Sequence, residues 1–156
     1  MRKGIGDNKM NRYLFLFFLI FTFESHASNF DLPIIHSEKN NSQCEILFDN
    51  KVVSKHICEY APPSFLKSYS LILDSWTSVW IFQDASEGNS CEGGPIRVIS
   101  ADSDKNLKNY PAIDYCSGKI VVKSNGDEVN IDIFSGADGV LSESWLFKDL
   151  SLKRIK

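Results

Sequence analysis

The chain has 156 residues, of which 43% are hydrophobic, and its 17 basic and 20 acidic side chains give a formal net charge of −3. The basic residues are scattered, with a cluster only at 153–156, so the sequence lacks the basic stripe of proteins that bind a phosphate backbone. Nucleic acid is therefore not an expected partner.

The first 27 residues have the layout of a secretory signal peptide. Four basic residues precede a largely apolar run at 13–23, and small residues, Ser25 and Ala27, stand at the −3 and −1 positions of a cleavage site. The run is shorter than the roughly 20 residues that a membrane-spanning helix needs, which makes an uncleaved anchor the less favoured alternative. We expect residues 1–27 to be removed on export, with no stable membrane insertion afterwards.

Residues 28–156 then form the mature chain of 129 residues, which we expect to fold as a single secreted β-rich domain. Loss of the signal leaves 13 basic and 18 acidic residues, a formal charge of −5. An acidic surface favours a basic partner. The expected location is the periplasm or the outside of the cell.

The four cysteines of the chain, Cys44, Cys58, Cys91 and Cys116, all follow the predicted signal peptide. An even number of cysteines in an exported chain indicates disulfides, and three pairings are possible. The spacing C-x2-C does not occur, so a zinc site has little support. We expect no metal and no cofactor.

Residues 44–60 predict a β-hairpin with Asp-Asn turn chemistry at 49–50. A loop centred on Lys51 would place Cys44 directly opposite Cys58, and cross-strand neighbours lie within disulfide reach. The favoured pairing is therefore Cys44–Cys58, which leaves the other two cysteines to pair with each other.

The stretch at 90–100, SCEGGPIRVIS, is open to two interpretations: a reactive thiol on a flexible loop, or a cross-linked turn that leads into a strand. A catalytic thiol must stay free and needs a nearby base. The mature chain has only His36 and His56, both distant from Cys91 in sequence. The cross-linked turn is favoured, with the glycines allowing a sharp reversal and the proline starting the strand.

The remaining sequence alternates short strands with turns. Residues 28–43 are expected to be a polar, extended leader, and residues 64–72 are a strand with a short helix as the alternative. The dense apolar run at 79–82 is typical of a central strand. Further hairpins are expected at 119–134, around Asn125-Gly126, and at 145–155, around Lys148-Asp149.

About eight short strands separated by turns predict an all-β fold, a small antiparallel β-sandwich or barrel with two disulfides. Two long loops, 85–95 and 101–115, are rich in polar and acidic residues. An exposed tryptophan beside acidic loops resembles a binding hot spot. The residues predicted to contact a partner are Trp76, Glu87, Glu92, Asp102, Asp104 and Tyr110.

Residues 102–106 form the one segment with calcium-like spacing, because Asp102, Asp104 and Asn106 stand at alternate positions. The EF-hand pattern fails, since Leu107 and Ile113 occupy the positions of the required Gly and Glu. The alternative is a solvated loop whose Asx side chains cap local backbone, and the sequence leaves calcium binding open.

No catalytic motif is present, and nothing visible would raise the pKa of a loop carboxylate such as Glu87 or Glu92. We expect a non-enzymatic binding module that recognises a protein or a cell-envelope ligand, in the manner of an inhibitor or immunity-type protein against a basic enzyme or toxin. The general pattern is similar to small periplasmic proteins of that class, and the similarity assigns no residue roles. The alternatives are a small envelope hydrolase that uses a carboxylate or serine, and a structural envelope component.

Overall fold

The computed structural model describes residues 35–72, 76–86, 88, 91–136 and 138–156. All of them belong to one compact unit, residues 31–156, and the predicted signal peptide lies outside the described residues. Among the described residues, no helix is long and apolar enough to cross a bilayer. The strands are β1 (Ile35–Asn40), β2 (Gln43–Phe48), β3 (Lys51–Ile57), β4 (Ser64–Ile72), β5 (Trp76–Gln83), β6 (Ile96–Ala101), β7 (Leu107–Asn109), β8 (Lys119–Asn125), β9 (Glu128–Phe134), β10 (Leu141–Lys148) and β11 (Ser151–Arg154).

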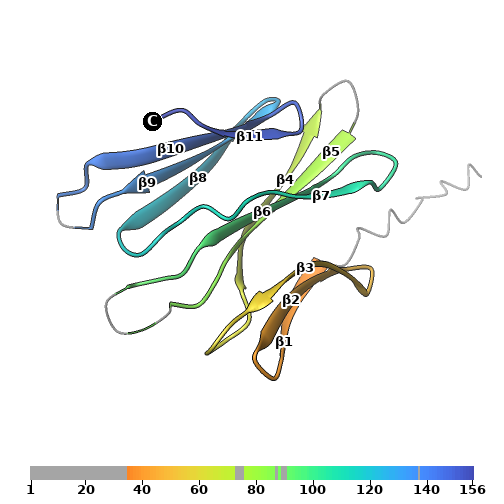
Figure 1. Cartoon of the computed structure of the whole chain (residues 1–156). Helices are drawn as coiled ribbons and strands as arrows, with labels where there is room; N and C mark the ends of the chain where they lie inside the picture. The colour runs from red at the N-terminus through yellow and green to blue at the C-terminus, as the bar shows by residue number, and fades with distance from the viewer. Residues whose placement is uncertain (1–34, 73–75, 87, 89–90, 137) are drawn as a thin grey trace, which may run out of the picture. The chain divides into compact units, whose positions relative to one another are not determined.

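These strands form three antiparallel sheets, which confirms the predicted all-β antiparallel class (Figure 1). Sheet A has the order β1-β2-β3, sheet B the order β4-β5-β6-β7, and sheet C the order β11-β10-β9-β8. One apolar cluster joins sheets B and C, and a second joins sheets A and B. Sheet B is therefore the middle layer of three.

Strand β5 shows why sheet B can serve as the middle layer. Val79 and Ile81 belong to the cluster shared with sheet C, whereas Trp80 and Phe82 belong to the cluster shared with sheet A. Successive side chains of a strand point to opposite faces, so an apolar run of this kind buries both faces of the sheet. The predicted central strand at 79–82 is confirmed.

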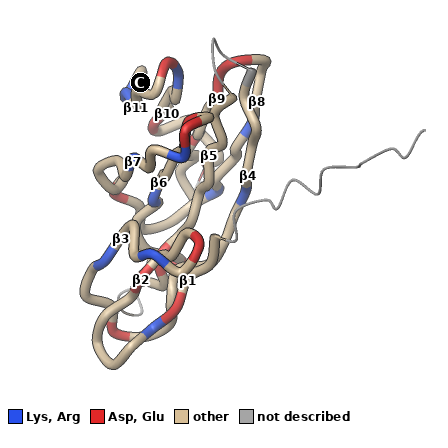
Figure 2. The backbone as a smooth tube through the Cα atoms, turned by 90° about the vertical axis from the view of Figure 1, so that its right-hand side faces the viewer, with Lys and Arg blue, Asp and Glu red and all other residues tan. Residues whose placement is uncertain are grey.

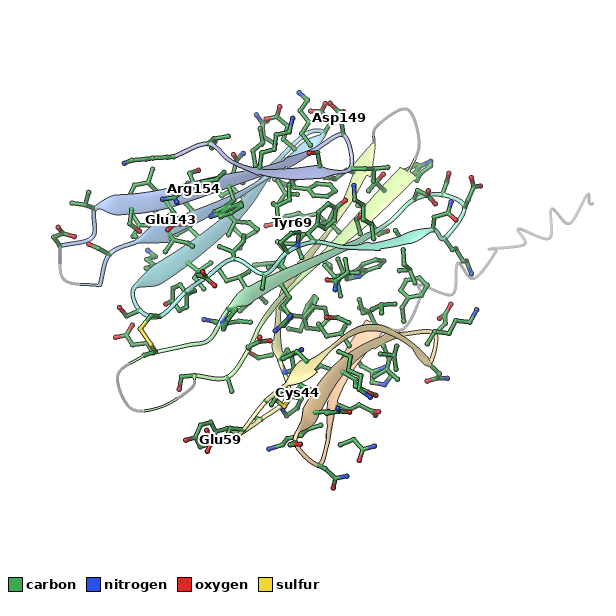
Figure 3. The ribbon with its side chains drawn as sticks, viewed as in Figure 1. Cys44, Glu59, Tyr69, Glu143, Asp149 and Arg154 are labelled. Atoms are coloured by element: carbon green, nitrogen blue, oxygen red, sulfur yellow. A yellow bond between two sulfur atoms is a disulfide. The ribbon has the colours of Figure 1, made fainter. Side chains whose placement is uncertain are left out.

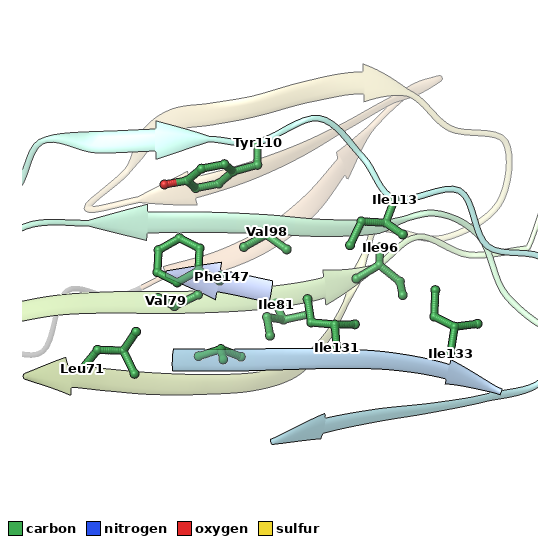
Figure 4. Close-up of a cluster of buried hydrophobic side chains, with 11 residues drawn as sticks. Leu71, Val79, Ile81, Ile96, Val98, Tyr110, Ile113, Ile131, Ile133 and Phe147 are labelled. Atoms are coloured by element: carbon green, nitrogen blue, oxygen red, sulfur yellow. The ribbon is translucent and has the colours of Figure 1, made fainter. Parts of the chain in front are cut away.

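The cluster between sheets B and C contains Phe147 and alternate residues of β5, β6 and β9 (Figure 4). Val129, Ile131 and Ile133 are buried while the residues between them are half-buried, as the alternation in the sequence predicted. Burying an aliphatic or aromatic side chain of this size contributes about 1.5–3 kcal/mol. The packing of sheet C on sheet B is thus the main apolar contact of the domain.

The first hairpin confirms the favoured disulfide but not the register from which it was derived. Asp49 and Asn50 have φ values of 49° and 62°, which suits a two-residue hairpin turn. Phe48 therefore pairs with Lys51, and a bulge after Ile46 then sets Cys44 opposite His56.

Cys58 nevertheless bonds to Cys44, with their Cα atoms 5.6 Å apart. The reason lies just beyond β3, where the Cys58 amide donates to the Ser42 carbonyl at 3.0 Å. This hydrogen bond keeps the segments that carry Cys44 and Cys58 side by side. Cys91 and Cys116 form the second disulfide, so the predicted connectivity is correct.

Two later turns lie one residue away from their predicted places. Asn125 pairs with Glu128, so Gly126, with φ 65°, is the first of two turn residues, as a type II′ turn favours. Lys148 pairs with Ser151, and the turn residues between them have positive φ.

One segment prediction is corrected and another is confirmed. Residues 35–40, expected to belong to an extended leader, form β1 and pair with β2 along its length. Residues 64–72 form β4 and not the alternative helix. The β-branched and aromatic side chains of this segment and its partner β5 favour a strand.

Candidate functional site

The predicted partner-contacting residues lie at two opposite ends of sheet B. Gln83 pairs with Ile96 at the end of β5 that leads into loop 85–95, whereas Ser78 pairs with Ala101 near the other end. Five residue steps at about 3.3 Å each separate these two pairs by about 17 Å. Glu92 therefore lies far from Trp76, Asp102 and Asp104, and Glu87 lies outside the described residues.

Trp76 is the first residue of β5 and not a turn residue, since it pairs with Ile72. Its side chain is 65% exposed. The ring is available to a ligand, and its role in binding stays a prediction.

Tyr110 is a core residue, and its predicted contact with a partner stays a prediction. Only 6% of its surface is exposed, and its ring packs edge-on against Phe147 at 5.5 Å. The hydroxyl donates to the Leu150 carbonyl at 3.0 Å and lies 3.1 Å from the Ser100 hydroxyl. Burial raises the pKa of Tyr110. The side chain joins sheets B and C.

The Asp102 carboxylate stabilises its own loop. Oδ1 accepts hydrogen bonds from the amides of Asp104 and Asn106, both at 2.9 Å, and Oδ2 accepts from the Asn106 side chain at 3.0 Å. These bonds lower the pKa of Asp102, the Asn106 side chain most of all. Among the described residues no group of three or more potential metal ligands occurs, and the local arrangement is that of a capped turn.

At the other end, loop 85–95 is closed at its neck by backbone and disulfide. The Asp84 amide donates to Pro95 O at 2.9 Å, and the Gly94 amide donates to Asp84 O at 3.0 Å. A Cβ atom on Gly94 would overlap the Ala85 carbonyl oxygen, so the close approach requires glycine. The stretch that begins with Cys91 is thus a cross-linked turn that leads into β6.

The loop that contains Cys116 is fixed to this neck. The Glu92 amide donates to Cys116 O at 2.7 Å, and the Glu92 carboxylate accepts from the Gly118 amide at 3.2 Å. Tyr115 donates its hydroxyl to Gly118 O at 2.6 Å. Burial, together with the charge of Glu92, raises the pKa of Tyr115. Glu92 therefore has a structural contact in addition to its exposed position.

A polar cluster of His56, Asp84 and Arg97 links sheets A and B. Arg97 Nε donates to both oxygens of Asp84 at 2.8 Å, and Nη2 lies 2.6 Å from Oδ2. His56 Nε2 lies 3.2 Å from Oδ1. All three side chains are largely buried. A two-pronged Arg–carboxylate contact of this kind fixes geometry as well as charge.

A shallow pocket of about 220 Å³, including its open mouth, lies over this cluster. Its lining residues are His56, Ile57, Cys58, Glu59, Tyr60, Asp84 and Ala85. The enclosed part of this space is only about 10 Å³, room for about one water molecule, so the depression is a surface feature and not a cavity for a whole substrate.

The rim of the pocket carries two exposed apolar side chains, Ile57 at 78% and Tyr60 at 56%. Lys39 holds the rim backbone, because its Nζ donates to the carbonyls of Glu59 at 2.5 Å and Tyr60 at 2.7 Å. The Glu59 side chain points away from the domain near Cys44 (Figure 3).

We name this region the disulfide end, defined as residues 57–60, 84–86, 91–94 and 116–118. Of the residues in this region, only Glu92 and the cysteines were predicted from the sequence. The available signal was the stretch ICEY at 57–60, in which apolar residues flank a cysteine at a strand end. The spatial approach of this stretch to Asp84 depends on the packing of sheet A on sheet B, which no local pattern contains.

Comparison with protein-family models, curated proteins and solved structures gives no significant match in any of the three. The class is therefore defined by the fold itself: an all-β domain of three antiparallel sheets with the disulfides Cys44–Cys58 and Cys91–Cys116.

Proposed function

We propose that this chain is an exported, disulfide-linked binding module that docks a basic protein through the disulfide end. The observation that carries the proposal is the pair of exposed apolar side chains, Ile57 and Tyr60, on a backbone that Lys39 and a disulfide hold in place. A binding surface that is already ordered loses less entropy when a partner docks. Exposed aromatic side chains of this kind are common hot spots.

Charge supports a basic partner. Glu59 and Glu92 are exposed at the disulfide end, and the mature chain has a formal charge of −5. Figure 2 shows acidic and basic residues interspersed along the chain, so the attraction comes from a few carboxylates and not from a large field of one sign. We therefore expect moderate salt dependence, chiefly in the association rate.

The chemistry fits an inhibitor or immunity-type protein that covers a basic enzyme or toxin in the periplasm or outside the cell. The predicted signal peptide and the two disulfides support that compartment. In this role a basic side chain of the partner, such as a lysine, would lie across the shallow pocket between Tyr60 and Ala85. Glu59 at the rim would form an ion pair with that side chain.

The test uses the mature, oxidised protein, immobilised and exposed to envelope and secreted proteins at low salt, with a purified lysozyme as a defined basic probe. We expect a basic protein that is retained, released by salt, and bound at least tenfold more weakly by the double variant Ile57→Ala/Tyr60→Ala. Val140→Ala, at a similarly exposed apolar position, is the matched control. Failure to retain any basic protein, or equal retention by the double variant, would contradict the proposal.

One observation favours the alternative of a small hydrolase, namely the His56–Asp84 contact at the floor of the pocket. A His–carboxylate pair can orient a general base. Here Arg97 engages both oxygens of Asp84, which favours a structural role. A substrate panel decides between them: turnover that His56→Ala abolishes, in a variant that stays folded, would establish the enzyme.

A further inference from the structure

Sheet A leaves part of the facing side of sheet B uncovered. Trp80 and Phe82 of β5 are buried against sheet A, but Ser68 and Ser70 of the neighbouring strand β4 are exposed. Phe65 and Trp76 are exposed as well, at 54% and 65%. The uncovered region therefore follows β4 and the start of β5.

The strand register places these side chains on one face. Ser68 pairs with Trp80 and Ser70 pairs with Ser78, and directly paired residues of an antiparallel sheet point to the same side. Trp76 shares that side with Trp80, because alternate residues of a strand do. We name this surface the β4 strip, defined as Phe65, Ser68, Ser70, Trp76 and Ser78.

The two aromatic rings lie towards opposite ends of the strip. Phe65 packs edge-on against its partner Phe82, with ring centroids 5.6 Å apart. Trp76 lies six residues before Phe82 along β5, a distance of about 20 Å in an extended strand. Between the rings the strip presents serine hydroxyls, each of which can both donate and accept a hydrogen bond.

The five residues of the strip carry no charge, although the mature chain is acidic as a whole. A charged polymer would find no counter-charge there and would lose solvation. A saccharide chain matches the strip in three respects: it can be uncharged, the apolar face of each sugar ring packs on an aromatic ring, and its hydroxyls can bond to serines. Aromatic side chains that are partly exposed to water suit a ligand that has both apolar and polar groups.

We propose that the β4 strip binds an extended, uncharged saccharide chain, with Trp76 and Phe65 as stacking platforms and the three serines as hydrogen-bonding groups between them. The separation of the rings requires a chain of several linked sugars. The proposal rests on residues outside the disulfide end, so it stands or falls independently of the protein partner.

An extended peptide is the competing occupant, because β4 is an edge strand of sheet B. Two features of β4 disfavour peptide addition. The register shifts between Phe65 and Lys67, and a bulge of this kind interrupts pairing along an edge. Lys67 adds an exposed charge to the same edge, which is a common protection against strand addition.

The test titrates the mature, oxidised protein with cellohexaose and chitohexaose, both uncharged, and with heparin and an uncharged extended peptide as comparisons. Calorimetry gives affinity, and acrylamide quenching of tryptophan fluorescence reports shielding of exposed Trp76. We expect at least one of the two uncharged oligosaccharides to bind and protect the fluorescence. Trp76→Ala and Phe65→Ala should each weaken binding at least tenfold.

Two further variants separate the strip from other causes. Ser70→Glu adds a charge at an exposed position and should weaken binding without removing a ring, whereas Ile57→Ala, at the disulfide end, should change nothing. Circular dichroism confirms that each variant is folded. The proposal is overturned if neither oligosaccharide binds at millimolar concentration, if Trp76→Ala binds as well as the original protein, or if only heparin or the peptide binds.

Discussion

The hydroxyl of Tyr110 joins three parts of the chain in the core, because it bonds to Leu150 and contacts Ser100. Burial raises the pKa of this side chain above its ordinary value of 10.0. The folded state therefore favours the protonated form. The stability that this provides is complete below pH 10 and is lost as the pH rises towards the folded-state pKa.

We expect the phenolate absorbance of Tyr110 to appear later in an alkaline titration than that of a free tyrosine, together with a loss of stability. Difference spectra against Tyr110→Phe isolate its contribution. That variant should itself lose about 1–3 kcal/mol in the free energy of unfolding, because Leu150 and Ser100 lose a buried partner. A Tyr110 that titrates like free tyrosine would contradict its burial.

At Thr77 we predict a substitution that raises stability. The residue is 1% exposed, and its Oγ1 has no hydrogen-bond partner among the described residues. Thr77→Val keeps the shape and removes the hydroxyl, so we expect stability to rise by about 1 kcal/mol. Thermal or urea denaturation measures the change. The control Ser100→Ala removes a hydroxyl that has a partner and should lower stability. A destabilised Thr77→Val variant would show that the hydroxyl is satisfied.

At the scale of elements, the Asp84 carboxylate connects sheet A to sheet B through His56 and Arg97. Removing one partner of a largely buried charged cluster leaves the others without compensation. We therefore expect Asp84→Asn to lower the free energy of unfolding by about 3 kcal/mol. Urea denaturation measures it.

The control is Asp127→Asn, which breaks the exposed pair with Lys148 at 3.7 Å and should cost at most about 0.5 kcal/mol. Equal effects of the two variants would mean that the Asp84 cluster does not link the sheets.

Sequence patterns predicted the hairpins well because alternation and turn residues are local. They placed turns one residue away from the observed positions, because two left-handed residues could be accommodated in more than one register, as at Asp149. The bulge after Ile46 has no local signature, yet it sets which residue faces Cys44. Strand β1 was missed because its polar residues lie at the edge of sheet A.

At the scale of the whole molecule, the disulfide Cys91–Cys116 closes a loop of 25 residues. The chain-entropy account gives about 3 kcal/mol for a loop of this size. We expect Cys91→Ser/Cys116→Ser to lose roughly that much stability while the sheets persist, measured by denaturation and circular dichroism. Because Glu92 would lose its fixed position, partner binding should weaken as well. An unchanged affinity for the partner would show that residues 91–94 do not belong to the docking surface.

The candidate site was only partly predictable. Glu92 and the four cysteines could be found from composition and spacing, and exposure of Trp76 follows from its place at a strand end. The burial of Tyr110 could not be predicted, because a tyrosine in a loop fills the core here only where the loop folds back through the Ile96–Ile113 bridge. The grouping of Ile57, Tyr60 and Asp84 requires the tertiary packing of sheet A.

The central claim is that the disulfide end docks a basic protein, and in-cell cross-linking tests it most directly. A photo-reactive amino acid is placed at residue 57 or, as the control, at residue 140; both native side chains are exposed. The account predicts that residue 57 forms an adduct with one basic protein outside the cytosol and that residue 140 does not. No adduct at residue 57, or the same adducts at both positions, would contradict the claim.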